Sequence, residues 1–148
     1  MKRILIDTEK CTGCKNCSIA CMQARRESGS VYDLNLVDIS AEPRNKILLN
    51  GKKEYKPLFC RHCDKPACVT SCMSGAMSKA PDGHVYYDRD KCGQCFMCVM
   101  NCSFGVLKPD RESGTYVVKC TFCADKDGDP QCVKMCPTKA IYVEEVGA

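Results

Sequence analysis

Short apolar stretches separated by polar residues mark the predicted secondary structure of this chain. Four of these stretches predict β-strands, at Arg3–Ile6, Val85–Tyr87, Tyr116–Lys119 and Ile141–Val143. Helices are predicted to begin near Lys15, Ala67, Phe96 and Gln131. Each helix is expected to continue through the last cysteine of a nearby group, which gives a fold of short strands and short helices.

A β-hairpin is predicted in the first half of the chain. Its strands are Lys46–Leu49 and Lys53–Leu58, and Asn50-Gly51 between them is a strong two-residue turn signal. A second turn is predicted at Pro81-Asp82-Gly83, where the two halves of the chain meet.

The apolar core available to this chain is thin for its length. Hydrophobic residues make up 45% of the 148 residues, which argues against disorder. However, 16 of these hydrophobic residues are cysteines, aromatic residues make up only 7% of the chain, and tryptophan is absent from the sequence. A chain with so little apolar bulk needs another source of stability, either disulfides or metal.

Cellular context favours metal over disulfides. The N-terminal residues show no secretory signal pattern, and no stretch approaches the roughly 20 apolar residues that span a bilayer. We therefore expect a soluble protein in the reducing cytoplasm, with no direct membrane insertion, where abundant cysteine indicates metal ligation.

The 16 cysteines fall into four groups of four. Groups one and three share the spacing C-x-x-C-x-x-C-x-x-x-C of bacterial ferredoxins, and they are Cys11, Cys14, Cys17, Cys21 and Cys92, Cys95, Cys98, Cys102. Groups two and four begin with C-x-x-C and end with C-x-x-x-C, and they are Cys60, Cys63, Cys68, Cys72 and Cys120, Cys123, Cys132, Cys136.

The chain contains an internal duplication. Groups one and three are offset by the same number of residues at every cysteine, and similar segments, Ile6–Lys10 and Tyr87–Lys91, precede them. This pattern divides the sequence into halves of roughly residues 1–81 and 82–148.

The spacing within each group predicts cubane [4Fe-4S] clusters. Three closely spaced cysteines wrap around one cluster, whereas the fourth points away and ligates a second cluster in two-cluster ferredoxins. The groups must therefore act in pairs, but the spacing alone allows group one to pair with either group two or group four.

Taken together, the four groups resemble the four-cluster ferredoxin subunits of anaerobic redox complexes. That family includes electron-transfer subunits of molybdopterin oxidoreductases, of formate hydrogenlyase and of carbon monoxide dehydrogenase systems. The resemblance covers essentially the whole chain, including the Cys136-Pro137-Thr138 ending of group four. It implies an α+β fold of two fused bacterial-ferredoxin-like units, with the predicted hairpin inserted in the first half.

The resemblance also implies how the groups share four [4Fe-4S] clusters, with group one pairing with four and group two with three. The two outer clusters would be held by Cys11, Cys14, Cys17, Cys136 and by Cys120, Cys123, Cys132, Cys21. The two inner clusters would be held by Cys60, Cys63, Cys68, Cys102 and by Cys92, Cys95, Cys98, Cys72. In this arrangement each half supplies ligands to the other, so the halves interleave.

Two features depart from the family pattern. The proline that usually follows the last cysteine of a group is present only as Pro137, because Met22, Met73 and Ser103 stand in the other three places. Lys139 stands where the family commonly has glycine. Neither change removes a ligand.

The motifs also allow three other interpretations. The C-x-x-C pairs suit structural zinc in a binding module without redox function, although three cysteines in close succession fit cubanes better. His62 is expected to be exposed or to lie beside the ligands rather than to bind iron. The alternating Asp125, Asp127 and Asp129 are expected to form a solvated loop, because Pro130 replaces the glycine that a calcium loop needs.

Charge and motif content exclude other functions. The formal net charge of +4 is offset by clusters that carry about −2 each, and the basic residues are scattered, so a nucleic-acid partner is not expected. The chain has no nucleophile with a partnered base and no phosphate-binding glycine loop, so it is not expected to be an enzyme.

The sequence therefore predicts an electron-transfer subunit within a hetero-oligomer. We expect it to carry electrons between a carbon monoxide dehydrogenase and a hydrogenase or flavin-dependent NAD(P) oxidoreductase. The alternative is the iron-sulfur subunit of a formate dehydrogenase or another molybdopterin oxidoreductase. No apolar tail follows Val146, which favours a soluble adaptor over a membrane-anchored subunit.

Overall fold

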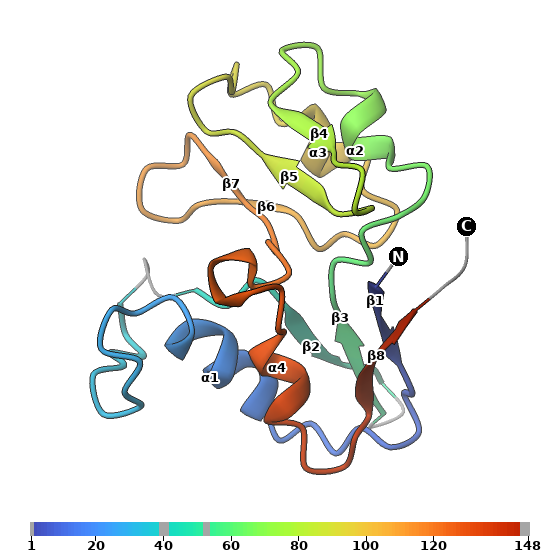
Figure 1. The fold of residues 1–148 in the computed structure, drawn as a ribbon. Coiled ribbons are helices and arrows are strands. Elements are labelled where there is room, and N and C mark those ends of the chain that lie inside the picture. Colours follow the sequence, from blue (N-terminus) through green and yellow to red (C-terminus); the bar gives the residue numbers. More distant parts are fainter. Residues whose placement is uncertain (1, 39–41, 52–53, 146–148) are drawn as a thin grey trace.

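The computed structural model describes residues 2–38, 42–51 and 54–145. Lys53, at the predicted start of a hairpin strand, and Val146, at the end of the sequence, lie outside these described residues. Within them, the chain forms two units that lie one above the other in Figure 1.

The two ends of the chain build the lower unit, which we call the terminal unit (residues 2–38, 42–51, 54–59 and 120–145). Strand β1 (Lys2–Ile6) pairs with β8 (Ile141–Glu145) in an antiparallel ladder that places Ile4 opposite Val143. Helices α1 (Asn16–Gln23) and α4 (Gln131–Lys134) pack together beside it (Figure 1). The first and last predicted strands thus become neighbours.

The terminal unit also contains a β-hairpin. Strands β2 (Lys46–Leu49) and β3 (Tyr55–Leu58) pair antiparallel, with Leu49 opposite Tyr55. This agrees with the predicted pairing of the two segments around Asn50-Gly51. That the hairpin is an insertion into a ferredoxin-like unit stays an interpretation of the sequence.

The middle of the sequence builds the upper unit, which we call the central unit (residues 60–119). It contains helices α2 (Ala67–Thr70) and α3 (Met97–Met100), which pack against each other. Its strands form two antiparallel pairs, which are β4 (Met77–Lys79) with β5 (Val85–Tyr87) and β6 (Lys108–Pro109) with β7 (Val117–Val118).

The helices are shorter than predicted. Only α1 continues through the last cysteine of its group, whereas α2, α3 and α4 have four residues each and end before Cys72, Cys102 and Cys136. The physical reason is a tight turn: the Cys72 N–H bonds the carbonyl of Val69, three residues back, and Gly75 then turns with a positive φ. No helix in the described part of the chain is long and apolar enough to cross a membrane.

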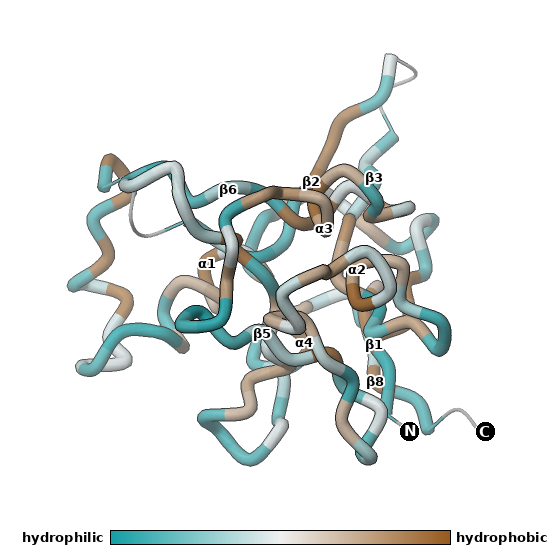
Figure 2. Tube along the Cα trace, turned by 90° about the horizontal axis from the view of Figure 1, so that it is seen from above, coloured by the Kyte–Doolittle hydropathy of each residue, from teal (hydrophilic) through white to brown (hydrophobic). Residues whose placement is uncertain are grey.

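Each unit has its own small core, and cysteines belong to both cores. The terminal core consists of Ile4, Cys17, Phe59, Phe122, Cys132 and Ile141. The central core consists of Cys60, Met77, Val85, Cys98, Val106, Leu107 and Val117. Figure 2 shows hydrophobic and hydrophilic residues alternating over short stretches of chain. The thin core predicted from the composition is therefore divided in two.

Candidate metal centres

All sixteen cysteines lie among the described residues, and all are free thiols. Most are buried or half-buried, but Cys14 and Cys95 are exposed. These two residues occupy the same position, the second cysteine, in groups one and three. The structure thus holds the thiols that metal ligation requires, with two of them reaching the surface.

A cavity in the terminal unit collects cysteines from both ends of the chain. Cys11, Cys14 and Cys17 line it from group one, and Cys136 lines it from group four. Residues of the β2–β3 hairpin complete its wall. Three local thiols and one remote thiol around a single cavity are the donor set of a cubane cluster.

A second cavity, in the central unit, has the same composition. Cys60, Cys63 and Cys68 line it from group two, and the remote thiol is Cys102 of group three. Both cavities therefore combine groups as the family resemblance implies.

Arg61 and Phe104 also lie at this second cavity. The Arg61 guanidinium lies 4.7 Å from the centre of the Phe104 ring, within the range of a cation–π contact. This contact connects the loop of group two with the turn that follows Cys102.

Electrostatic interactions between thiols indicate which groups the other remote cysteines lie near. Burial raises the pKa of Cys98, and the charges of Cys72 and Cys92 raise it further. Burial likewise raises the pKa of Cys132, with contributions from Cys120 and Cys21. Cys72 thus lies near group three, and Cys21 lies near group four.

Tight loops with left-handed residues arrange the local thiols. Positive φ angles occur at Lys15, His62 and Phe96, all within or next to cysteine groups. Gly13 has a φ of 70°, and a Cβ atom there would overlap the ring of Tyr55 on β3. Residues in this conformation turn backbone N–H groups toward one side of the loop, where they can face a cluster.

The remote cysteines Cys72 and Cys136 share a distinct environment. Burial raises the pKa of each thiol, but hydrogen bonds outweigh burial, so the pKa of each is lowered. The Met77 N–H donates to Cys72 Sγ at 3.3 Å, and the N–H groups of Ala140 and Ile141 act on Cys136 in the same way. Deprotonation, which metal ligation requires, is therefore easier at these two thiols than at an ordinary cysteine.

Lys139 follows the second of these cysteines and has a φ of 52°. Gly75 and Gly105, at the corresponding places after Cys72 and Cys102, have φ values of 70° and 59°. This left-handed conformation explains why glycine suits the position, and Lys139 adopts it without a glycine's freedom.

Buried local thiols favour the protonated state before metal binds. Burial raises the pKa of Cys17 and Cys68 to about 11 and that of Cys120 to about 12. Metal ligation must displace these protons, so cluster assembly is coupled to proton release and to folding.

The other sequence hypotheses have different outcomes. His62 is 1% exposed and lines the cavity of the group-two cysteines, so of the two expected positions it takes the one beside these cysteines rather than the exposed one. Its Nδ1 accepts a hydrogen bond from the Val85 N–H at 3.0 Å. Asp125 and Asp127 are exposed, as the solvated-loop prediction requires.

No three His, Cys, Asp or Glu side chains of the described residues converge as the ligands of a single metal ion.

Sequence reasoning missed Lys119. Its side chain is buried, with 4% of the residue exposed, and its Nζ donates to the carbonyls of Val85 and Cys120. The available signal was the position of this lysine, at the end of a predicted strand and directly before a cysteine. That position does not predict whether a lysine side chain is buried or solvated.

Family comparisons place the cysteine groups in a known context. Two models, both described as a 4Fe-4S dicluster domain, match residues 3–73 and 52–146. Together they cover all four groups. Sixteen cysteines in two dicluster domains fit four [4Fe-4S] clusters.

Curated relatives match nearly the whole chain. The B subunit of anaerobic dimethyl sulfoxide reductase from Escherichia coli (strain K12) is 34% identical over 143 residues, covering 92% of this chain and 69% of the relative. The iron-sulfur subunit of the nitrate-inducible formate dehydrogenase of the same strain is 36% identical over 155 residues. That match covers 93% of this chain but only 52% of the formate dehydrogenase subunit.

A solved structure shares the fold. It is described as the active site complex BamBC of benzoyl coenzyme A reductase in complex with 1,5-dienoyl-CoA. The match has a TM-score of 0.54 and 27% sequence identity, and it covers 100% of this chain and 79% of the other.

Proposed function

The chain belongs to the family of 4Fe-4S dicluster domain proteins, and from this premise we propose that it relays single electrons through four [4Fe-4S] clusters. The observation that carries the proposal is the composition of the two cavities. Each combines three thiols of one group with the last thiol of another, which is the ligand pattern of paired cubanes.

We further propose the complete ligand assignment. Group one shares clusters with group four, and group two shares clusters with group three. The cavities support two of the four sets, and the coupling of Cys98 with Cys72 and of Cys132 with Cys21 supports the other two. When bound, the clusters supply one-electron chemistry, and the protein supplies thiolates, N–H donors and exclusion of water.

The exposed thiols indicate where electrons would enter and leave. Cys14 lies in the loop before α1 in the terminal unit, and Cys95 lies in the loop between β5 and α3 in the central unit. Each belongs to a proposed cluster in a different unit. A relay with one surface-exposed ligand in each unit can accept an electron from one protein and pass it to another.

We propose that the catalytic partner is a molybdopterin oxidoreductase of the dimethyl sulfoxide reductase or formate dehydrogenase type, within a hetero-oligomer. The relatives from Escherichia coli support this alternative. The expectation of a carbon monoxide dehydrogenase partner receives no support from these relatives. The division of labour is the same in both cases, because catalysis would take place on another subunit.

Metal analysis of the anaerobically purified protein tests the electron-transfer proposal. Four cubanes predict about sixteen iron and sixteen sulfide per chain, a brown colour, and electron paramagnetic resonance signals after reduction with dithionite. A colourless protein that contains zinc in place of iron would overturn the proposal in favour of a structural zinc module.

Copurification from the source organism tests the partner. A tagged chain is expected to recover a larger subunit that contains molybdenum. Recovery of a nickel-containing enzyme without molybdenum would instead support the carbon monoxide dehydrogenase expectation. The matched control is the same tagged chain with Cys14→Ser and Cys95→Ser, which tests whether recovery depends on the clusters with exposed ligands.

A further inference from the structure

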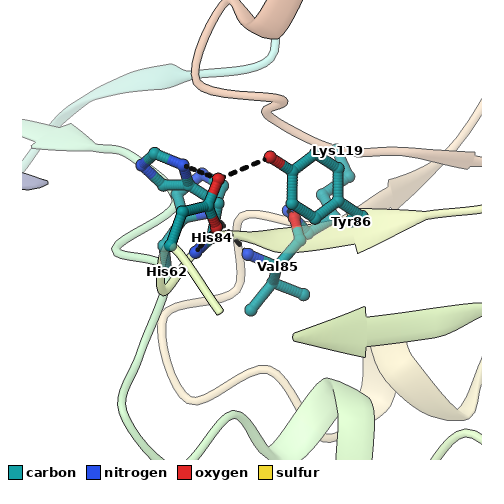
Figure 3. A network of polar contacts seen from close by, with 6 residues as sticks. His62, His84, Val85, Tyr86 and Lys119 are labelled. Atoms are coloured by element: carbon teal, nitrogen blue, oxygen red, sulfur yellow. Dashed lines mark hydrogen bonds and ion pairs between the residues drawn. The ribbon is translucent and has the colours of Figure 1, made fainter. Parts of the chain in front are cut away.

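A buried lysine lies at the junction of the two units. The Lys119 Nζ donates to the carbonyl of Val85 (Figure 3) at 2.6 Å. It also donates to the carbonyl of Cys120 at 2.8 Å. Val85 belongs to the central core, whereas Cys120 is the first cysteine of group four in the terminal unit. The ammonium group therefore lies where the chain passes from the central unit into the terminal unit.

The ammonium lies beside cysteines of two groups. Lys119 directly precedes Cys120, the first cysteine of group four. Val85, whose carbonyl accepts its hydrogen bond, also lines the cavity of Cys60, Cys63 and Cys68 in group two. Lys119 is thus close to ligands of two of the proposed clusters.

No carboxylate among the described residues forms an ion pair with Lys119. A buried ammonium without a compensating negative charge is costly, because it loses its hydration. Two carbonyl oxygens compensate only part of this cost. Clusters that carry about −2 each on both sides would supply the missing negative charge.

Aromatic side chains exclude water from this region. His62 and Phe122 occupy the third position of the C-x-x-C motifs of groups two and four, and each is 1% exposed with a positive φ. Their rings meet edge to face at 5.6 Å, and His84 stacks on Phe122 at 4.4 Å. In such a dry environment a fixed charge acts more strongly than it does in water.

His62 also fixes the strand that Lys119 contacts. Its Nδ1 accepts the Val85 N–H at 3.0 Å, so both backbone polar groups of Val85 are bound at the junction (Figure 3). Asp82, a carboxylate of the same network, is directed instead to His84 and Tyr86. The position of the ammonium is therefore set by the carbonyls of Val85 and of the adjacent Cys120.

We propose that Lys119 is an electrostatic tuning residue shared by two clusters, whose fixed positive charge raises the reduction potential of both. This inference rests on the proposed ligand assignment. A cluster that accepts one electron gains one negative charge while its donor loses one, and a nearby cation stabilises the reduced state of either cluster.

Redox titration of anaerobic holoprotein, followed by electron paramagnetic resonance with dithionite as reductant, tests this inference. Lys119→Met removes the charge and keeps a similar length, and it is expected to lower two of the four midpoint potentials more than the others. Lys119→Arg keeps the charge and is expected to leave the potentials close to those of the wild type. Unchanged potentials in Lys119→Met, or an equal shift of all four, would overturn the proposal.

Two further variants separate charge from packing. Lys65→Met removes a charge from an exposed residue at the cavity of Cys60, Cys63 and Cys68, and solvent screening predicts a smaller shift there. Lys119→Gln retains a hydrogen-bond donor without the charge. If both neutral Lys119 variants lose clusters while Lys119→Arg retains four, the charge is required, which supports the proposal.

The same loss in Lys119→Arg would assign Lys119 a packing role and overturn the proposal. The experiment also separates this inference from the proposed function. Wild-type protein without four clusters would contradict the proposed function. Wild-type protein with four clusters and insensitive potentials in Lys119→Met would contradict only the role of Lys119.

Discussion

The terminal and central units hold similar cysteine groups, but the strands that pair in them come from different distances along the sequence. The terminal unit depends on five paired positions between β1 and β8, which come from opposite ends of the sequence. The central unit depends on the three pairs of β4 with β5, two strands that are close neighbours along the chain. The same metal-binding motif thus occurs once beside strands that are distant in sequence and once beside strands that are close in sequence.

The difference teaches what the clusters must do for folding. Local contacts form with a small loss of chain entropy, whereas joining distant ends costs more. In the terminal unit, Cys136 and the group-one thiols line one cavity, so a cluster there would connect the segments that β1 and β8 also connect. We therefore expect the terminal unit to depend more on its metal than the central unit does.

The largest expected effect comes from removing a remote ligand. Cys136→Ser should lower the iron content by at least about four atoms per chain, because one cubane loses its fourth thiolate. The β1 and β8 amides should then exchange hydrogen faster in anaerobic exchange mass spectrometry.

Cys102→Ser is the matched variant in the central unit. It should remove a cluster there and leave the β1 and β8 amides protected. Equal exchange of these strands in the two variants would contradict the dependence of the terminal unit on its own cluster.

Core truncations should produce the next largest effects. Phe122→Ala is expected to cost about 3–5 kcal/mol of unfolding free energy, because the ring is 1% exposed and fills the terminal core. Because Phe122 also contacts His62 and His84, exchange should increase in both units.

Ile4→Ala provides the comparison within the same core. Its expected cost is about 2–5 kcal/mol, and the faster exchange should be confined to the terminal unit. If Phe122→Ala left the amides of β5 unaffected, the junction would not couple the units.

A smaller effect is expected at the residue directly before the second cysteine of groups one and three. Gly13→Ala should destabilise the protein by about 1–3 kcal/mol, because the new Cβ meets Tyr55 and the left-handed backbone becomes strained. The rate at which a chelator bleaches the clusters measures the effect.

Gln94→Ala is the control, because Gln94 already holds a side chain at the corresponding position, with a φ of 56°. It should bleach at nearly the wild-type rate. Equal acceleration in the two variants would show that the contact with Tyr55 does not distinguish the units.

The smallest effects are expected at two equivalent surface ion pairs. Lys10 contacts Asp7 at 2.7 Å, and Lys91 contacts Asp88 at 2.9 Å. Hydrogen bonding to the lysine is the largest cause that lowers the pKa of each aspartate below its ordinary value of 3.8.

Because these pKa values are lowered on folding, any stabilisation is present above the ordinary pKa and is lost as the pH falls below it. Asp7→Asn and Asp88→Asn should therefore change the bleaching rate little and to the same extent at neutral pH, since exposed pairs contribute little. A large effect of only one substitution would reveal an asymmetry between the units that their geometry does not predict.

The local features of the fold could be predicted from the sequence. Strand β5 matches its predicted residues, and the two predicted hairpin segments pair with each other. The two-residue turn was wrong, because Leu49 lies opposite Tyr55 and five residues, 50–54, join the strands. The cysteine spacing likewise predicted which thiols lie in one loop. These features depend on residues that are close together along the chain, where turn chemistry and periodicity act directly.

Features that depend on distant residues could not be predicted in this way. No local signal pairs Ile4 with Val143, and the ends of α2, α3 and α4 are set by turns that the cysteine spacing does not encode. Burial of Lys119 depends on the distant Val85, whose carbonyl it binds. The family resemblance, rather than the spacing, supplied the pairing that both cavities support.

The exposure of Cys14 and Cys95 has a consequence for survival in air. Oxygen reaches exposed iron–sulfur ligands before buried ones, so oxidative damage should begin at the clusters of these two cysteines. Loss of those clusters would disconnect the protein from its partners while the clusters around Lys119 remain intact. Exposure to air should therefore stop electron exchange with partner proteins before iron is lost from the clusters near Lys119.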